Sequence, residues 1–320
     1  MRKKWLLFSI PFLVATLFLS GCSSSDSGTA SKDKSDKINV YTTVYPLQYL
    51  AEQIGGDKVS VKSVYPPGSD AHSYEPTQKD MMNIADSDLF FYIGLGMEGF
   101  VDSAKDSLKN ENVRFVATAD KLDLPKDPDA AFEEEDSDHA DEEEHGDINP
   151  HVWLDPVYME QMATIVKDQL TKEMPSAKEE FEKNYQKVEA DLKELDASYR
   201  DMAEHAKRKD FVTAHAAYSY WETEYGLNQI PIAGISTDDE PSQKKLQQIV
   251  DTINEKNIPY IMLEQNTNSK IADVIQQETN TKTLTLHNLE TLTQKDIDQN
   301  RDYMSIMKDN LQALTTALND

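Results

Sequence analysis

The chain has 320 residues, of which 38% are hydrophobic and 28% are charged, and this length and apolar content suit one large or two modest globular domains. Its formal net charge is -26, which excludes nucleic acid and anionic lipid headgroups as favourable partners.

The N-terminus has the pattern of a lipoprotein signal. Basic residues at 2–4 and an apolar run at 5–19 precede Gly21-Cys22, which contains the only cysteine of the chain. An uncleaved anchor helix is the alternative, but Gly21-Cys22 stands where cleavage should fall, so residues 1–21 are predicted to be removed. Cys22 then carries a lipid and residues 22–37 form a flexible tether. We expect a protein anchored by lipid to the cell membrane, on its extracytoplasmic face.

Strand-like and helix-like segments alternate through residues 38–175, the predicted N-terminal lobe. Short runs rich in β-branched and aromatic residues predict strands at 38–41, 59–64, 89–93 and 113–116. One helical pattern at 47–54 ends at a pair of glycines, and another is opened by a capping box of Thr77 and Asp80. This alternation indicates βαβ units and a parallel sheet flanked by helices.

Residues 126–148 interrupt this lobe with a run of Asp and Glu that contains His139, His145 and one aromatic residue. Such a composition cannot form a packed core, so we predict a disordered loop. The loop is either a solvated acidic segment or an auxiliary metal-collecting arm.

Residues 176–208 predict one long helix that connects two lobes. Apolar residues recur in steps of four and three from Phe181 to Met202, and no Gly or Pro interrupts them. A capping box of Ser176 and Glu179 is expected at its start. The apolar stripe could form a coiled-coil dimer, but a single stripe with a lobe on each side favours packing along both lobes, and hence a monomer.

The alternation returns in residues 209–320, the predicted C-terminal lobe. Strands are expected at 211–214, 229–233, 260–263 and 283–286, and helices at 216–225, 241–255, 268–278 and 302–318. The predicted fold class is therefore α/β, with two lobes that each contain a parallel-type sheet flanked by helices, joined by one long backbone helix.

Four histidines stand near the ends of predicted strands: His72, His151, His215 and His287. Ligands of open parallel sheets bind beyond the carboxyl ends of the strands. A single histidine is more often a core or surface residue, but three from two lobes favour a Zn²⁺ site, because Zn²⁺ binds neutral imidazoles from separate elements.

An oxygen ligand would complete a tetrahedral zinc site with His72, His151 and His215. Glu290, after the last predicted strand, is the first choice. His287 and Glu264 are the alternatives.

The motifs around these residues resemble those of the metal-specific solute-binding lipoproteins of ABC importers, and most of all the zinc-uptake branch. They are the lipobox, Gly-x-x-x-His-x-Tyr-Glu-Pro from residue 68, Asn-Pro-His-Val-Trp-Leu-Asp-Pro from residue 149, and His-x-Ala-x-x-Tyr from residue 215. The resemblance covers essentially all of the mature chain. It implies a Zn²⁺ ion held in the cleft between the lobes by His72, His151, His215 and Glu290. In that family the fourth ligand varies between Asp, Glu and water.

The same resemblance implies a partner permease and its ATPase in the membrane, which import the captured zinc. It also implies that a His- and acid-rich insertion, as at 126–148, is typical of the zinc branch.

Two alternative functions remain at this point. Manganese-type members of the family have an acidic residue where His215 stands, and three imidazoles favour Zn²⁺ over Mn²⁺. A zinc hydrolase would also use three histidines, but the sequence contains no His-Glu-x-x-His or Gly-x-Ser-x-Gly motif, and a fourth protein ligand would fill the position that catalysis needs. We therefore expect that the protein is not an enzyme.

Overall fold

The computed structural model describes residues 37–126, 148–236, 241–265 and 270–320. The chain divides into Met1–Ser35 and Asp36–Asp320, and only the second unit contains described residues. The predicted signal, Cys22, nearly all of the tether and the acidic loop with His139 and His145 lie outside them, so these predictions are untested. None of the helices in the described part of the chain combines the length and the apolar character that a membrane span needs.

The first sheet consists of the four parallel strands predicted for the N-terminal half, each within one residue of its expected bounds. The elements are β1 Ile38–Thr42, α1 Tyr45–Gly55, β2 Val59–Ser63, α2 Gln78–Ala85, β3 Leu89–Tyr92, α3 Val101–Ser107 and β4 Arg114–Ala117. The strand order is β2-β1-β3-β4. The predicted capping box of Thr77 and Asp80 opens α2, which confirms that prediction.

The second sheet repeats this order as β6-β5-β7-β8, again with parallel strands. The elements are β5 Asp210–Thr213, α6 Tyr220–Tyr225, β6 Asn228–Pro231, α7 Gln243–Lys256, β7 Tyr260–Leu263, α8 Lys270–Thr279, β8 Lys282–Thr285, α9 Gln294–Asp298 and α10 Tyr303–Asn319. The prediction that α6 begins at Ala216 is wrong. Ala216 N instead donates to Gly234 O at 2.9 Å, which ties this segment to the loop after β6.

Two helices, α4 Pro156–Glu173 and α5 Lys178–His205, lie between the sheets in the sequence. At 1.5 Å per residue α5 is about 42 Å long. The capping box expected at Ser176 and Glu179 is absent: Ala177 is the N-cap without a side-chain hydrogen bond, because a 3₁₀ turn at Pro175–Ala177 leads into the helix.

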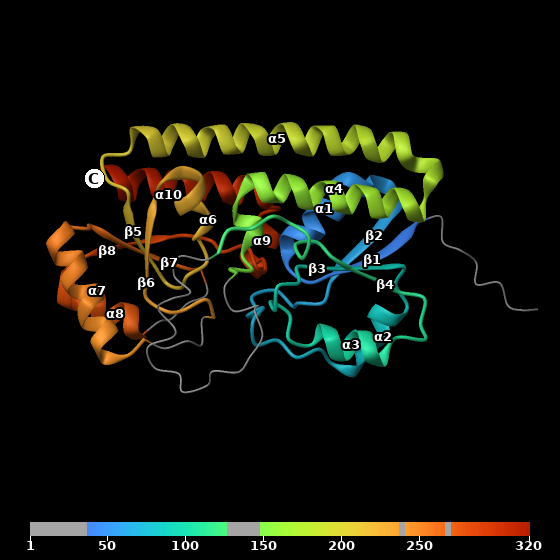
Figure 1. Cartoon of the computed structure of the whole chain (residues 1–320), viewed down its shortest axis with the longest axis horizontal. Helices are drawn as coiled ribbons and strands as arrows, with labels where there is room; N and C mark the ends of the chain where they lie inside the picture. The colour runs from blue at the N-terminus through green and yellow to red at the C-terminus, as the bar shows by residue number, and fades with distance from the viewer. Residues whose placement is uncertain (1–36, 127–147, 237–240, 266–269) are drawn as a thin grey trace, which may run out of the picture. The chain divides into compact units, whose positions relative to one another are not determined.

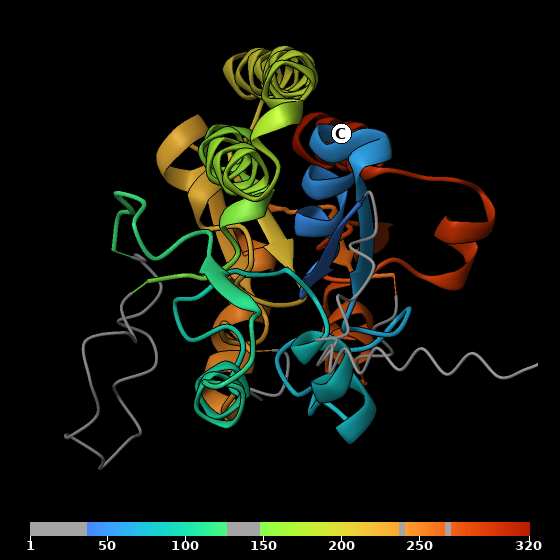
Figure 2. The ribbon, with the colours of Figure 1, turned by 90° about the vertical axis from the view of Figure 1, so that its right-hand side faces the viewer.

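The apolar stripe of α5 is buried along its whole length, and α5 packs against α1 and α4 at one end and α6 and α10 at the other (Figure 1). The predicted packing along both lobes is therefore confirmed. The end view shows α1, α4 and α10 between α5 and the strands (Figure 2).

One large hydrophobic core extends from the first sheet through these helices to one face of the second sheet, where it includes Phe211 and Met262. Val212 and Ile261, on the opposite face of the same strands, belong to a smaller core with α7 and α8. Both halves of the chain thus share one packed interior, and the loops after their strands face each other.

Candidate metal centre

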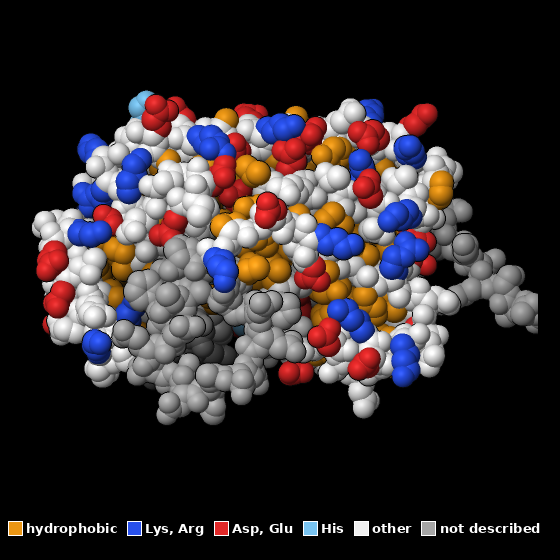
Figure 3. All heavy atoms as spheres, in the orientation of Figure 1, with side chains coloured by type: hydrophobic (Ala, Val, Ile, Leu, Met, Phe, Trp, Pro, Cys, Tyr) orange, Lys and Arg blue, Asp and Glu red, His pale blue; other side chains and the backbone are white. Residues whose placement is uncertain are grey.

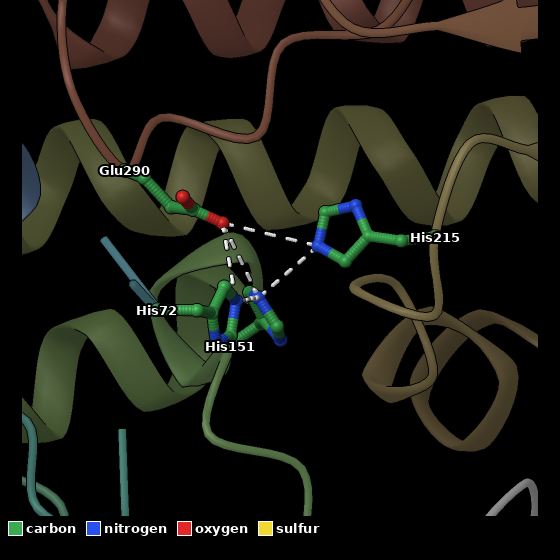
Figure 4. A group of neighbouring side chains, drawn as sticks. All are labelled: His72, His151, His215 and Glu290. Atoms are coloured by element: carbon green, nitrogen blue, oxygen red, sulfur yellow. Dashed lines mark hydrogen bonds and ion pairs between the residues drawn. The ribbon is translucent and has the colours of Figure 1, made fainter. Parts of the chain in front are cut away.

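Three imidazole rings and one carboxylate meet where these loops face each other: His72, His151, His215 and Glu290 (Figure 4). His151 Nε2 lies 3.2 Å from the Nε2 atoms of both His72 and His215. Glu290 Oε1 lies 3.5, 3.5 and 3.8 Å from the Nε2 atoms of His72, His151 and His215. With metal–ligand bonds of about 2.0–2.1 Å, the edges of a tetrahedron are about 3.3–3.4 Å long. The distances given above lie near this length and all four donor atoms lie within 4.8 Å of one another, so the group is compact enough to hold one metal ion.

His72 lies in the loop between β2 and α2, where Asp70 shapes the backbone. Asp70 Oδ1 accepts hydrogen bonds from His72 N at 2.8 Å and from Ser73 N at 3.1 Å. The His72 side chain is 11% exposed, whereas the other three are at most 4% exposed. The group is therefore most accessible to solvent beside His72.

His151 is fully buried and its ring orientation is fixed by Asn149. Asn149 Oδ1 accepts from His151 N at 3.0 Å and pairs with His151 Nδ1 at 2.7 Å. Because an amide oxygen only accepts, Nδ1 carries the hydrogen and Nε2 presents a lone pair to the other donor atoms. Just beyond, Asp155 caps α4 through Val157 N at 2.7 Å, as predicted.

The segment that carries His151 precedes α4 but is held by the C-terminal half of the chain. Asn149 Nδ2 donates to Ala216 O at 2.6 Å, and Trp221 Nε1 donates to Leu154 O at 2.8 Å. Trp153 Nε1 donates to Asn288 O at 2.8 Å. These bonds cross from the loop before α4 to the loops after β5 and β8.

Glu290 has the reverse arrangement, since it follows β8 but contacts the N-terminal half. Its backbone O accepts from Tyr45 N at the start of α1 at 2.9 Å. Its Oε2 accepts from Ala71 N, beside His72, at 3.4 Å. One carboxylate oxygen thus contacts the His72 loop while the other faces the three imidazoles.

The two alternative fourth ligands lie outside the group. His287 Nδ1 accepts from Leu289 N at 2.9 Å and its Nε2 is 3.4 Å from Asp296 Oδ2, so both ring nitrogens are engaged elsewhere. Glu264 pairs with Nδ1 of His215, on the side of the ring opposite Nε2. Of the three residues considered for the fourth ligand, Glu290 is the one that lies with the three histidines.

The charge states of the group are set by burial and by neighbouring charges. Burial lowers the pKa of His151 to about 3. Burial also opposes charge on His215, but the Glu264 carboxylate raises its pKa above the usual value. Burial likewise opposes ionisation of Glu290, yet the His151 and His72 rings keep its pKa well below the usual value. Glu290 Oε1 is buried and accepts no hydrogen bond from the described residues, so the site is suited to a cation.

Acidification is expected to weaken binding of Zn²⁺ at this group. Because the pKa of His215 is raised above its usual value, a proton competes with the metal for Nε2 of this ring. Affinity should therefore fall as pH drops from about 7.5 to about 5.5, around the ordinary histidine pKa, with at least one proton taken up per ion released. Calorimetric titration in buffers of different ionisation enthalpy measures both quantities.

In the metal-free protein, lower pH has the opposite effect, because protonation of His215 increases the stability of the fold. A raised folded-state pKa of His215 adds stability below the unfolded pKa of about 6.5, and this stability is lost as pH rises through the folded value. An affinity for Zn²⁺ that stayed constant over the tested range would contradict the expectation.

Sequence reasoning missed the residues that hold the ligands in place. Asn149 could have been found, because Asn side chains often bond to backbone groups two residues onward, and His151 is two residues away. Asn288, which donates to Glu264 Oε2 at 2.9 Å, gave no local signal, because its partner is 24 residues distant. Glu264 itself was considered only as a ligand.

Comparison with known proteins gave matches over nearly the whole chain. A family described as zinc-uptake complex component A, periplasmic (ZnuA), matches residues 40–317. The high-affinity zinc uptake system protein ZnuA of Bacillus subtilis strain 168 is 38% identical, over 99% of both chains. The zinc-binding lipoprotein AdcA of Streptococcus pneumoniae strain R6 is 36% identical over 94% of this chain, which spans 58% of the length of that relative.

A solved structure supports the same relationship. The crystal structure of the Zn(II)-bound ZnuA-like domain of Streptococcus pneumoniae AdcA matches with a TM-score of 0.74 at 33% identity. The match covers 89% of this chain and 100% of the other.

Proposed function

The chain belongs to the zinc-uptake component A (ZnuA) family, and on that premise we propose that it is an extracytoplasmic solute-binding protein that captures Zn²⁺ for an ABC importer. The ligands in this proposal are His72, His151, His215 and Glu290. The observation that carries it is the close grouping of three imidazole nitrogens and one carboxylate oxygen, all within 4.8 Å of one another.

The donor set is the one that Zn²⁺ prefers. Imidazole and carboxylate ligands in tetrahedral geometry are typical of zinc, whereas Mn²⁺ favours octahedral oxygen-rich sites. The manganese alternative is therefore the weaker one. Glu290 Oε1, which accepts no hydrogen bond from the described residues, gains a partner when a cation binds, and this favours binding of the ion.

The protein is proposed to hold its cargo rather than to catalyse a reaction on it. Four protein ligands fill a tetrahedral zinc site and leave no position for an activated water molecule. The family is a class of solute-binding proteins for zinc uptake, which is not an enzyme class.

We propose that this capture step takes place at a membrane. We propose that Cys22 carries the lipid, that residues 22–37 are the tether, and that a permease and its ATPase receive the zinc. On the face shown in Figure 3, acidic and basic side chains are interspersed over α4 and α5, which is unlike a nucleic-acid interface. The acidic segment with His139 and His145 is proposed to bind zinc weakly as an auxiliary arm.

Titration with Zn²⁺ against a competing chelator is expected to show one tight equivalent per chain, and Mn²⁺ at equal concentration should not displace it. The control is a variant in which residues 132–146 are replaced by a neutral linker. This variant should keep the tight equivalent and lose only weaker ones. Displacement of Zn²⁺ by equal Mn²⁺ would assign the chain to manganese uptake, and loss of the tight equivalent in the linker variant would place a ligand in the acidic segment.

A further inference from the structure

Glu264, which follows β7, is a buried carboxylate beside the metal group but not part of it. Its Oε1 pairs with Nδ1 of His215, and its Oε2 accepts from Asn288 Nδ2 at 2.9 Å. The residue is 8% exposed. Both oxygens face donors, so a carboxylate satisfies both sides at once, whereas an amide could satisfy only one.

Asn288 extends this contact to the other ligands. Its Oδ1 accepts from Glu290 N at 3.2 Å, and its backbone O accepts from Trp153 Nε1. The Trp153 ring lies 5.2 Å, centroid to centroid, from the ring of His151. Asn288 thus links Glu264 to the backbone of Glu290 and to the Trp153 ring, which packs against His151.

Charge gives Glu264 a second role. A buried divalent cation bound by neutral imidazoles needs two negative charges for balance, and Glu290 supplies only one. Glu264 supplies the other from the far side of the His215 ring. A carboxylate in this position also fixes the tautomer of a metal-binding histidine and raises the basicity of its donor nitrogen.

We propose that Glu264 is a positioning residue for zinc capture, and this proposal rests on the proposed zinc function. Glu264 holds the His215 ring with Nε2 toward the ion and links the ring through Asn288 to the segment of Glu290. It does not touch the ion. Its effect on the geometry of the site is transmitted mainly through His215.

The test is Glu264→Gln, which keeps the volume but removes the charge and one acceptor. Zn²⁺ affinity should fall about 10–100-fold, the usual cost of losing such a support. In the metal-free protein, ¹⁵N NMR of the imidazoles at a pH where His215 is neutral should show hydrogen on Nδ1 in the parent and a population with hydrogen on Nε2 in the variant. A merely structural carboxylate would not move this signal.

Glu98→Gln is the matched control. Glu98 is also a buried carboxylate, 6% exposed, and accepts from Thr43 Oγ1, Ile93 N and Gly94 N at 2.7, 2.8 and 3.1 Å. Its replacement perturbs a buried hydrogen-bond network whose partners, Thr43, Ile93 and Gly94, include none of the proposed ligands. We expect lower thermal stability with unchanged Zn²⁺ affinity and an unchanged His215 tautomer.

A double-mutant cycle tests the route of action. In a His215→Ala background, Glu264→Gln should cause a much smaller further loss of affinity than in the parent, because the ring that it positions is gone and only its charge still acts on the ion. An equal loss in both backgrounds, or a parent-like tautomer and affinity in Glu264→Gln, would overturn the proposal. Failure of the parent protein to bind Zn²⁺ tightly would instead refute the proposed function, so the two failures are distinguishable.

Discussion

Replacing His215 with alanine should abolish tight zinc binding and lower the affinity for Zn²⁺ by more than about 100-fold, because residues that only support metal ligands already contribute 10–100-fold. His215 is fully buried, and its Nε2 is 3.2 Å from Nε2 of His151. His151→Ala should have an equally large effect. Competition with a chelator of known zinc affinity measures the loss.

The chain offers a control histidine on its surface. His205, near the end of α5, has a side chain that is 72% exposed and pairs with Asp201. His205→Ala should leave both the affinity and the stoichiometry unchanged. If His215→Ala and His151→Ala each kept the tight equivalent, the assignment of the site would be wrong.

A thousandfold excess of Zn²⁺ over its dissociation constant should stabilise the folded protein by about 4 kcal/mol, because ligands from both halves of the chain assemble only in the native state. For a protein of this size the melting temperature should rise by about 10 °C. Scanning calorimetry with and without Zn²⁺ measures the shift.

The same scan on His215→Ala separates site binding from general effects of the ion. Its melting temperature should barely respond to Zn²⁺. A shift equal to that of the parent protein would show that the ion stabilises the fold elsewhere, and no shift in the parent would contradict binding to the native state.

Much of the fold could be predicted because its signals are local. The strands carry β-branched and aromatic runs, and Thr77 with Asp80 forms a capping box of adjacent groups. One failure involves a distant contact, because Ala216 N bonds to Gly234 O in the loop after β6 and the helix begins only at Tyr220. The other is local, because Pro175 opens a 3₁₀ turn that displaces the capping box expected at Ser176.

The four proposed ligands could be selected from the sequence because three of them follow strands and His151 stands between a proline and the capped start of α4, and the structure brings all four together. Their supports could not be selected in the same way. Glu264 and Asn288 meet only because β7 and β8 are neighbours in the sheet and both end at the same edge. Such pairings depend on strand order and register, which no local pattern fixes.

The loops that carry His151 and Glu290 are each held by hydrogen bonds from the other half of the chain, and this limits how metal preference can be exchanged between relatives. The segment of His151 is held by Trp221 and Ala216 from the other half, while the backbone of Glu290 is held by Tyr45. Recombination between two relatives at the connecting helix would separate each of these residues from the groups that orient it. Relatives that differ in cargo should therefore exchange their full binding properties only when the loops from both halves are transferred together.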